Sequence, residues 1–330
     1  MKNKAILNPI LLILFPLLIL GISLFIGRYP KPLFMPLNVL LNDELAQQLV
    51  FNLRLPRLIT AALLGMSLSA AGGVMQMLFR NPLVEPGFLG VTQGAGFGAA
   101  LSILFLATSP LVIELSATSF AVLGLVLSYF IARRIRYGGW VLRLVLAGIA
   151  VSALFSAGLG ILKYVADPTS QLPEIVFWLL GGLYSVTWTD LLYILPVVII
   201  GLLIIYLMRW RLNLLALSDE TAFSLGVAVG RERTLLLAAS VAVTAVVVSV
   251  AGIVGWIGLI IPHIARRVTS ANAAEFIPFS MSLGAVFAII CDDLARVLIV
   301  GEIPLGIITS LIGAVIFLIM MTSQNLRISK

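Results

Sequence analysis

An apolar stretch of 22 residues, from Leu58 to Phe79, most constrains what this chain can fold into. It contains no charged residue and lies between Arg54-Leu-Pro-Arg57 and Arg80-Asn-Pro. A helix of about 20 residues crosses the hydrocarbon core of a bilayer, so the stretch is long enough to span a membrane. It also contains many small or polar residues, namely Gly65, Ser67, Ser69, Gly72, Gly73 and Gln76. Small residues let helices approach closely, so the sequence predicts a helix packed among other helices rather than surrounded by lipid.

The whole chain has the composition of a polytopic membrane protein. Its 330 residues are 61% hydrophobic and 11% charged, whereas a soluble domain carries about 25% charged residues. Gly252, Gly255 and Gly258 favour a break near Ala251, which divides one long run into two segments. We therefore expect a single all-α domain over residues 1–330 with about ten transmembrane helices, within the apolar segments 8–27, 57–79, 88–107, 110–132, 141–164, 189–208, 233–250, 252–266, 277–297 and 304–322.

The first segment resembles a signal peptide, since the basic stretch Met1–Lys4 precedes an apolar run from Ala5 to Gly27. The run is longer than a signal-peptide core, and no small-residue cleavage site follows it. We expect an uncleaved first span.

Ten spans place both termini on one side of the membrane. With the termini inside, fifteen of the 21 Lys and Arg residues fall in inner segments and six on the outer side. This bias follows the positive-inside rule and predicts cytoplasmic termini. It also explains the net charge of +7 without a nucleic-acid partner.

Two loops are too patterned to be simple connections. The outer one contains the apolar run Pro173–Gly182, and we expect a short helix over about 172–182 at the outer mouth. The inner one, over about 212–226, carries Leu214, Leu217, Phe223 and Leu225, with Ser218 or Asp219 as a possible helix cap. Two short amphipathic helices there would form a docking surface for a protein, and a loop at the lipid interface is the alternative.

Several kinds of chemistry are missing. The single Cys291 and single His263 exclude an intramolecular disulfide and a multi-histidine metal site. None of the five lysines follows a glycine, so no P-loop is present, and any ATPase must be a separate subunit. We expect no catalytic residue, no cofactor and no metal site, and an intramembrane enzyme is the weakest alternative.

An ion-coupled secondary transporter is a stronger alternative, because such carriers often hold carboxylates near the membrane midplane. Asp292 and Asp293 come nearest to this pattern. Arg296 follows them at i+3 and i+4, so we interpret the three residues as an ion pair at a helix end.

Small residues recur every four positions in the fifth segment, at Gly148, Ser152, Ser156 and Gly160. Close helix packing explains such a stripe. The alternative is a wall of a wide translocation path, where small side chains leave room for a bulky solute.

Six motifs, in order along nearly the whole chain, resemble the FecCD permease family, the membrane subunits of ABC importers for iron-siderophores, haem and cobalamin. They are Arg54-Leu-Pro-Arg57, Asn81-Pro-Leu-Val-Glu-Pro-Gly-Phe-Leu-Gly90, Leu146-Ala-Gly148, Phe177-Trp-Leu-Leu-Gly-Gly182, Gly258-Leu-Ile-Ile-Pro-His-Ile-Ala-Arg266 and Gly301-Glu-Ile-Pro-Leu-Gly306. The resemblance implies a BtuC-like importer fold in the inner membrane that works by alternating access. It further implies a homodimer, two cytoplasmic ATPase subunits and a periplasmic substrate-binding protein, with no catalytic activity in the permease itself.

The resemblance also implies roles for particular residues. Arg54, Arg57 and Arg296 would receive acidic residues of the binding protein, and Pro56 indicates that the first two lie at a helix N-terminus. The cytoplasmic gate would comprise Asn81, Pro82, Leu83, Val141 and Leu142. Contact with the ATPase would come from Leu214, Leu217, Asp219, Glu220, Ala222, Phe223 and Gly226.

The chain departs from the family pattern at Ser218, Ile253, Trp256 and Val315. Changes at 253 and 256 would alter the shape of the broken eighth segment. They are compatible with a branch of different solute, including molybdate or tungstate. The solute itself is not encoded in a passage of small residues.

Overall fold

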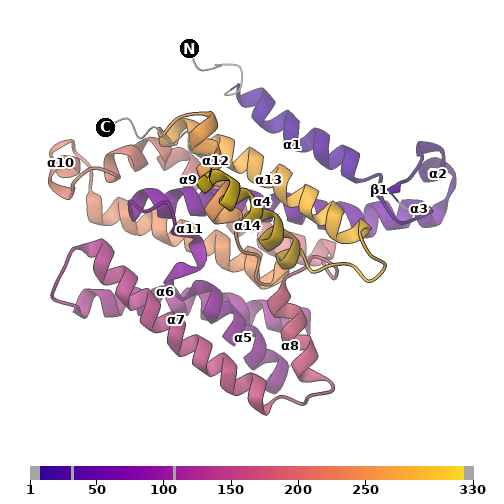
Figure 1. Ribbon diagram of the computed structural model, residues 1–330, viewed down its shortest axis with the longest axis horizontal. Helices are drawn as coiled ribbons and strands as arrows, with labels where there is room; N and C mark the ends of the chain where they lie inside the picture. Colours follow the sequence, from indigo (N-terminus) through magenta and orange to yellow (C-terminus); the bar gives the residue numbers. More distant parts are fainter. Residues whose placement is uncertain (1–7, 31–32, 107–108, 323–330) are drawn as a thin grey trace.

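The computed structural model describes residues 8–30, 33–106 and 109–322, and these residues form a bundle of α-helices (Figure 1). The long helices run along the longest axis of the molecule. The helices of more than six residues are α1 (Pro9–Ser23), α4 (Leu55–Leu78), α5 (Val91–Phe105), α6 (Pro110–Arg134), α7 (Trp140–Val165), α8 (Gln171–Leu180), α9 (Trp188–Leu215), α11 (Val229–Ala251), α12 (Ile257–Val268), α13 (Ala273–Val297) and α14 (Leu305–Thr322).

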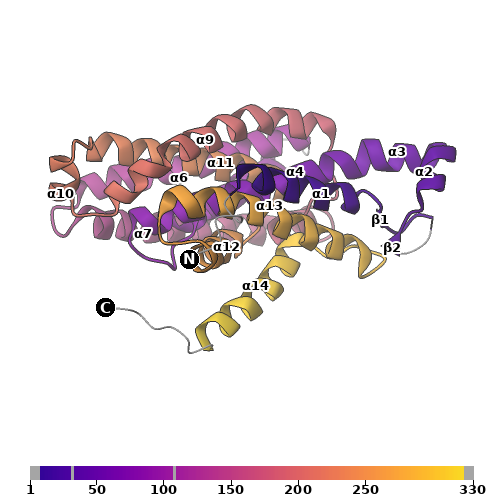
Figure 2. The same ribbon diagram turned by 90° about the horizontal axis from the view of Figure 1, so that it is seen from above.

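Short elements occupy the two ends of the bundle. At one end lies α10 (Asp219–Ser224), and at the other lie α2 (Leu37–Asn42) and α3 (Glu44–Gln48) (Figure 2). We call these the α10 end and the α3 end. A two-stranded antiparallel sheet at the α3 end pairs β1 (Ile26–Gly27) with β2 (Leu33–Phe34) in the register Ile26–Phe34 and Gly27–Leu33.

Each of the ten predicted crossing segments contains a helix. Within the described part of the chain, seven helices are long and apolar enough to cross a membrane. The other three, α1, α5 and α12, have 15, 15 and 12 residues. Helices α5 and α12 are shorter than their apolar segments because non-α-helical backbone before their first residues takes up part of each segment.

Small residues on α4 allow it to lie at the centre of the bundle, as predicted. A Cβ atom on Gly65 would stand 2.0 Å from the carbonyl oxygen of Gly284 in α13, and one on Gly284 would stand 2.3 Å from that of Gly65. Gln76 Nε2 donates to the carbonyl oxygens of Gly258 and Leu259 in α12, at 3.2 and 3.1 Å. Such close contacts are typical of helix pairs in membranes.

The start of α4 differs from the prediction. The helical backbone continues upstream through a π-helical stretch, η2 (Leu49–Arg54), into α3, so one helical stretch covers Glu44–Leu78. Helix α4 itself begins at Leu55 with Pro56 in its first turn, as predicted, but Arg54 and Arg57 do not stand at a free helix N-terminus, because the helical backbone continues upstream. Pro56 is tolerated because it directly follows the π-helical stretch, where the regular α-helical hydrogen-bond pattern is already interrupted.

The predicted break between the seventh and eighth segments is confirmed. Helix α11 ends at Ala251, and α12 begins at Ile257. Gly252 has a φ of +66°, and a Cβ there would stand 2.2 Å from the carbonyl oxygen of Trp178 in α8. Glycine is required at this position for both reasons.

Both loops that were predicted to contain short helices do contain helical backbone. Helix α8 falls within the outer loop nearly as predicted. In the inner loop, the prediction of two short helices is wrong in part, since α9 extends to Leu215 and supplies the first, and α10 alone is separate. The apolar residues Leu212 and Leu215 are buried and hold the last turn of α9 against the bundle.

Candidate functional site

The α10 end presents an apolar surface built from few residues. Leu217, Phe223 and Leu225 are 40%, 76% and 54% exposed. We call these three residues the α10 surface. Leu214 is half-buried, packed on the core, and Glu220 is exposed.

Local sequence fixes the shape of α10. The Ser218 hydroxyl accepts a hydrogen bond from the Thr221 backbone N–H at 3.2 Å, so it is the N-cap. Ala222 is buried and holds the helix to the bundle. Gly226 follows with a φ of +80°, a conformation that glycine adopts readily.

Asp219 joins α10 to α11. Its Oδ1 accepts from Arg233 Nη2 at 2.7 Å and its Oδ2 from Nη1 at 3.3 Å. These hydrogen bonds lower the pKa of the Asp219 carboxyl, although partial burial opposes the shift. The Asp219 carboxylate is therefore ionised at physiological pH.

The predicted gate residues lie at the same end of the bundle. Asn81, Pro82, Leu83 and Leu142 are exposed, and Val141 is half-buried. These residues form two stretches of the chain, 81–83 and 141–142. The stretches are joined by the preceding residues Phe79 and Trp140, whose ring centroids are 5.6 Å apart. The structure therefore brings together two stretches separated by about 60 residues.

At the α3 end, the three predicted docking arginines turn inward. Arg54, Arg57 and Arg296 are 8%, 8% and 7% exposed. Arg57 Nε lies 2.8 Å from Asp292 Oδ1, and its Nη1 lies 2.9 Å from Glu302 Oε2. Arg54 Nη1 donates to the carbonyl oxygen of Leu24 at 3.0 Å.

The predicted pairing of Arg296 is confirmed. Its Nε lies 3.0 Å from Asp292 Oδ2, and its Nη2 contacts Asp293. Asp293 also accepts from the Ser23 hydroxyl at 2.6 Å, which ties α1 to α13. We call Arg57, Asp292, Asp293, Arg296 and Glu302 the ionic cluster.

Sequence reasoning missed two members of this network. Glu302 belongs to a family motif but lies 245 residues from Arg57, and Ser23 is a single hydroxyl in an apolar span. Glu302 has a φ of +53°, which is unusual for a residue other than glycine. That backbone turns its side chain toward Arg57.

The small-residue stripe on α7 divides into two parts. Gly148 is buried, and a Cβ there would stand 3.2 Å from Leu89 Cα, so it packs against the short 3₁₀-helix η3 (Pro86–Leu89). Ser152 is half-buried, whereas Ser156 and Gly160 are exposed. A Cβ on Gly160 would meet nothing within 4 Å.

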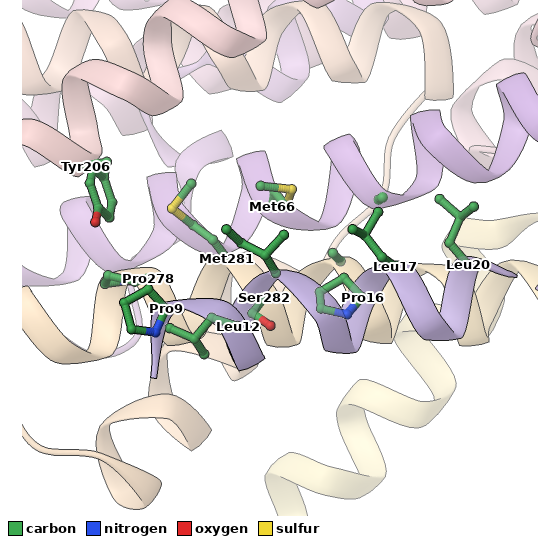
Figure 3. A pocket seen from close by; sticks show the side chains of 13 residues that line it. Pro9, Leu12, Pro16, Leu17, Leu20, Met66, Tyr206, Pro278, Met281 and Ser282 are labelled. Carbon is green, nitrogen blue, oxygen red and sulfur yellow. The ribbon is translucent and has the colours of Figure 1, made fainter. Parts of the chain in front are cut away.

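One cavity lies between α1 and its neighbours α4, α9 and α13 (Figure 3). It has a volume of about 330 Å³. Figure 3 shows proline, leucine and methionine side chains around it, with Tyr206 and Ser282 as the polar exceptions. Such a lining offers almost nothing to hold a polar solute.

A larger groove, of about 900 Å³, lies between the loop after α4, helix α8, the α11–α12 connection and α14. It includes the predicted gate residue Leu83 and the carboxylate of Glu85. Its wall carries backbone and hydroxyl groups as well as apolar side chains. Among the described residues, no group of three or more His, Cys, Asp or Glu could hold a metal ion.

Comparison with known proteins agrees with this architecture. The model of the FecCD transport family matches residues 12–323. The molybdate import system permease protein MolB of Haemophilus influenzae is 38% identical over 309 residues, which cover 90% of this chain and 89% of that protein. A probable iron chelatin transport system permease protein of Helicobacter pylori is 39% identical over 281 residues, 84% of each chain.

A solved structure gives the same result for the fold. It is an inward-facing conformation of an ABC transporter assigned to the metal-chelate type, with a TM-score of 0.87 and 37% identity. The match covers 95% of this chain and 98% of the other. This chain therefore belongs to the FecCD transport family of membrane permeases.

Proposed function

We propose that this chain is the membrane subunit of a binding-protein-dependent ABC importer for an iron chelate, haem or cobalamin. In this account two copies surround a translocation path, and two ATPase subunits bind at the α10 ends. A substrate-binding protein delivers the solute at the opposite side. The permease has no catalytic step of its own, and ATP binding and hydrolysis in the partner switch its gates.

The distribution of charge supports a cytoplasmic α10 end. Eleven arginines lie at helix ends or loops on that side, against five described basic residues at the other. The N-terminal end of α1 lies on the same side, since Pro9 lines the cavity that Tyr206 of α9 also lines (Figure 3). The C-terminal end of α14 lies there too, since Arg267 donates to the Met320 carbonyl oxygen at 3.2 Å. By the positive-inside rule this is the cytoplasmic side, with both termini in the cytoplasm.

The observation that carries the proposal is the α10 surface. An exposed apolar group on an aqueous face that is not lipid-embedded marks a protein-interaction site. Phe223, at 76% exposure, is its most prominent member. It stands where the family resemblance places the ATPase contact.

The test is the variant Phe223→Asp. Because the side chain makes few contacts within the chain, the variant should fold and insert normally, yet its ATPase should no longer co-purify. Ser224→Asp is the matched control, since it adds the same charge at the next residue, which is also exposed. Retention of the ATPase by Phe223→Asp, or equal loss in Ser224→Asp, would contradict an apolar anchor at 223.

A second solute class has a specific observation in its favour, namely the similarity to a molybdate permease. Importers of this type take much of their selectivity from the binding protein. Binding of ferric hydroxamate, haem, cobalamin and molybdate to that partner, measured side by side, decides between chelate and oxyanion. Tight binding of molybdate alone would contradict the chelate assignment.

The proposed docking and path residues have different support. Ser156 and Gly160 are accessible, which fits a path, and Gly148 closely flanks it. Arg54, Arg57 and Arg296 are buried, so the structure gives less support to their direct contact with a binding protein. Within the ionic cluster, the carboxylate of Glu302 is the charge most accessible to a partner.

A further inference from the structure

Arg233 is nearly buried at an end of the molecule where most charged residues are exposed. It lies in the first turns of α11 and is 6% exposed. One edge of its guanidinium group forms the two hydrogen bonds to Asp219, at 2.7 and 3.3 Å. The group also lies over the Trp140 ring, with Cζ 4.4 Å from the ring centroid.

Trp140 continues the chain of contacts to the gate. Its ring centroid is 5.6 Å from that of Phe79, the residue that directly follows α4. Phe79 stands two residues before Asn81, and Trp140 directly precedes Val141. Each of the two gate stretches therefore closely follows one residue of this aromatic pair.

A second contact joins the same segments. Arg80 donates from Nη2 to the carbonyl oxygen of Leu217, a member of the α10 surface. The α10 segment is thus tied to the end of α4 directly and, through Arg233, to the start of α7. Arg211, by contrast, reaches Glu232 only at 3.9 Å with half of its side chain exposed.

The chemistry of arginine suits a contact of this kind. Its planar guanidinium group binds a carboxylate along one edge while its face stacks on an aromatic ring, which lysine cannot do. Because the Arg233 side chain is shielded from solvent, salt screens its attraction to the more exposed Asp219 carboxylate less than it screens a pair of two exposed charges. Energetic coupling between sites is carried by packed side chains and ion pairs of this kind.

We propose that Arg233 is a positioning residue that transmits displacement of α10 to the gate through Asp219 on one side and Trp140 and Phe79 on the other. The inference rests on the proposed function, since it assumes that an ATPase moves α10. It adds a residue that lies outside both the ATPase contact and the gate.

Cysteine accessibility tests the relay without knowledge of the solute. The single native cysteine, Cys291, is buried, so Leu142→Cys provides a reporter at a position 47% exposed. The rate of labelling by a membrane-impermeant maleimide is measured on the complex with its ATPase, nucleotide-free and trapped with ATP and vanadate. The chain without the reporter gives the background.

We expect the two states to differ in labelling rate when Arg233 is present. In Arg233→Gln the ATPase should still co-purify and hydrolyse ATP, while the difference between states should fall by about tenfold, within the usual range of coupling between sites. Arg233→Lys should recover only part of it. Arg211→Gln, the matched control, should behave as the parent.

Trp140→Leu is the second variant, since Trp140 is half-buried, an apolar side chain replaces its ring, and it lies outside both the ATPase contact and the gate. It should also reduce the difference between states while keeping the ATPase. A full difference in both variants would overturn the relay, as would loss of the ATPase in both. A parent complex whose labelling ignores nucleotide would instead contradict the proposed function.

Discussion

Arg57 holds a charge in a site almost closed to solvent. Its side chain is 10% exposed and that of Asp292 is fully buried. A buried charge left without any partner costs about 3–5 kcal/mol, and loss of Arg57 would leave Asp292 with Arg296 as its one remaining ion-pair partner among the described residues, so this range is an upper limit. The structural role of Arg57 is therefore large, whatever its role in docking.

We predict that Arg57→Met lowers the free energy of unfolding by up to about 3–5 kcal/mol. The double variant with Asp292→Asn should recover part of the loss, because it removes a buried carboxylate that has lost one of its two arginine partners, while Asp293 still pairs with Arg296. Thermal unfolding of the purified protein in detergent measures both. Equal stability of Arg57→Met and the parent would show that Arg296 alone compensates the charge of Asp292.

The burial of Arg54 and Arg57 makes their replacement by glutamate a poor test of binding-protein docking. The new negative charges would lie beside Asp292, Asp293 and Glu302, so misfolding of the permease would be mistaken for lost docking. Glu302→Gln is a milder probe, since Glu302 is partly exposed.

At this scale the sequence predicted what is local. The pairing of Arg296 with Asp292 and Asp293 follows from helical spacing alone. The pairing of Arg57 with Asp292 spans 235 residues and depends on how α4 packs on α13. No pattern within either segment specifies that contact.

Among the elements, α4 shows most clearly what a helix sequence specifies. Its small residues predicted close packing, and the reciprocal approach of Gly65 and Gly284 confirms it. Its upstream boundary was not predictable, because the polar stretch Glu44–Gln48 has the composition of a loop. It is helical because Ala46 and Val50 pack with Met35 in a small separate core.

We predict that Gly65→Ala destabilises the protein by about 1–3 kcal/mol or more, since the added methyl group meets the rigid backbone of α13. Gly160→Ala is the matched control in another apolar helix, and it should leave stability unchanged. Unfolding measured on both variants decides. Similar stabilities would mean that α4 and α13 separate at low cost.

In the small-residue stripe on α7, we expect a bulky substitution to change uptake rather than stability. Ser156→Trp should leave expression and thermal stability unchanged, since the residue is exposed, and it should block uptake if this face borders the path. Gly160→Ala again serves as the control, with uptake retained. Poor expression of Ser156→Trp would instead indicate a packed interface between copies.

For the whole molecule, the number and order of helices were predictable because hydropathy and length determine which segments can cross a membrane. The joining of the α10 segment to the gate was not, since it depends on side chains of Phe79, Trp140 and Arg233 from three distant segments. The exposed apolar face of α14, including Leu311 and Leu318, is consistent with lipid or a second copy.

We propose that a separate ATPase drives transport through this permease. The most direct test of this proposal is uptake into vesicles that hold the permease, its ATPase and its binding protein, loaded with whichever of ferric hydroxamate, haem, cobalamin or molybdate that protein binds. We predict that vanadate abolishes uptake and that an uncoupler at fixed ATP leaves it unchanged. Uptake that survives vanadate but collapses with the uncoupler would identify an ion-coupled carrier and contradict the account.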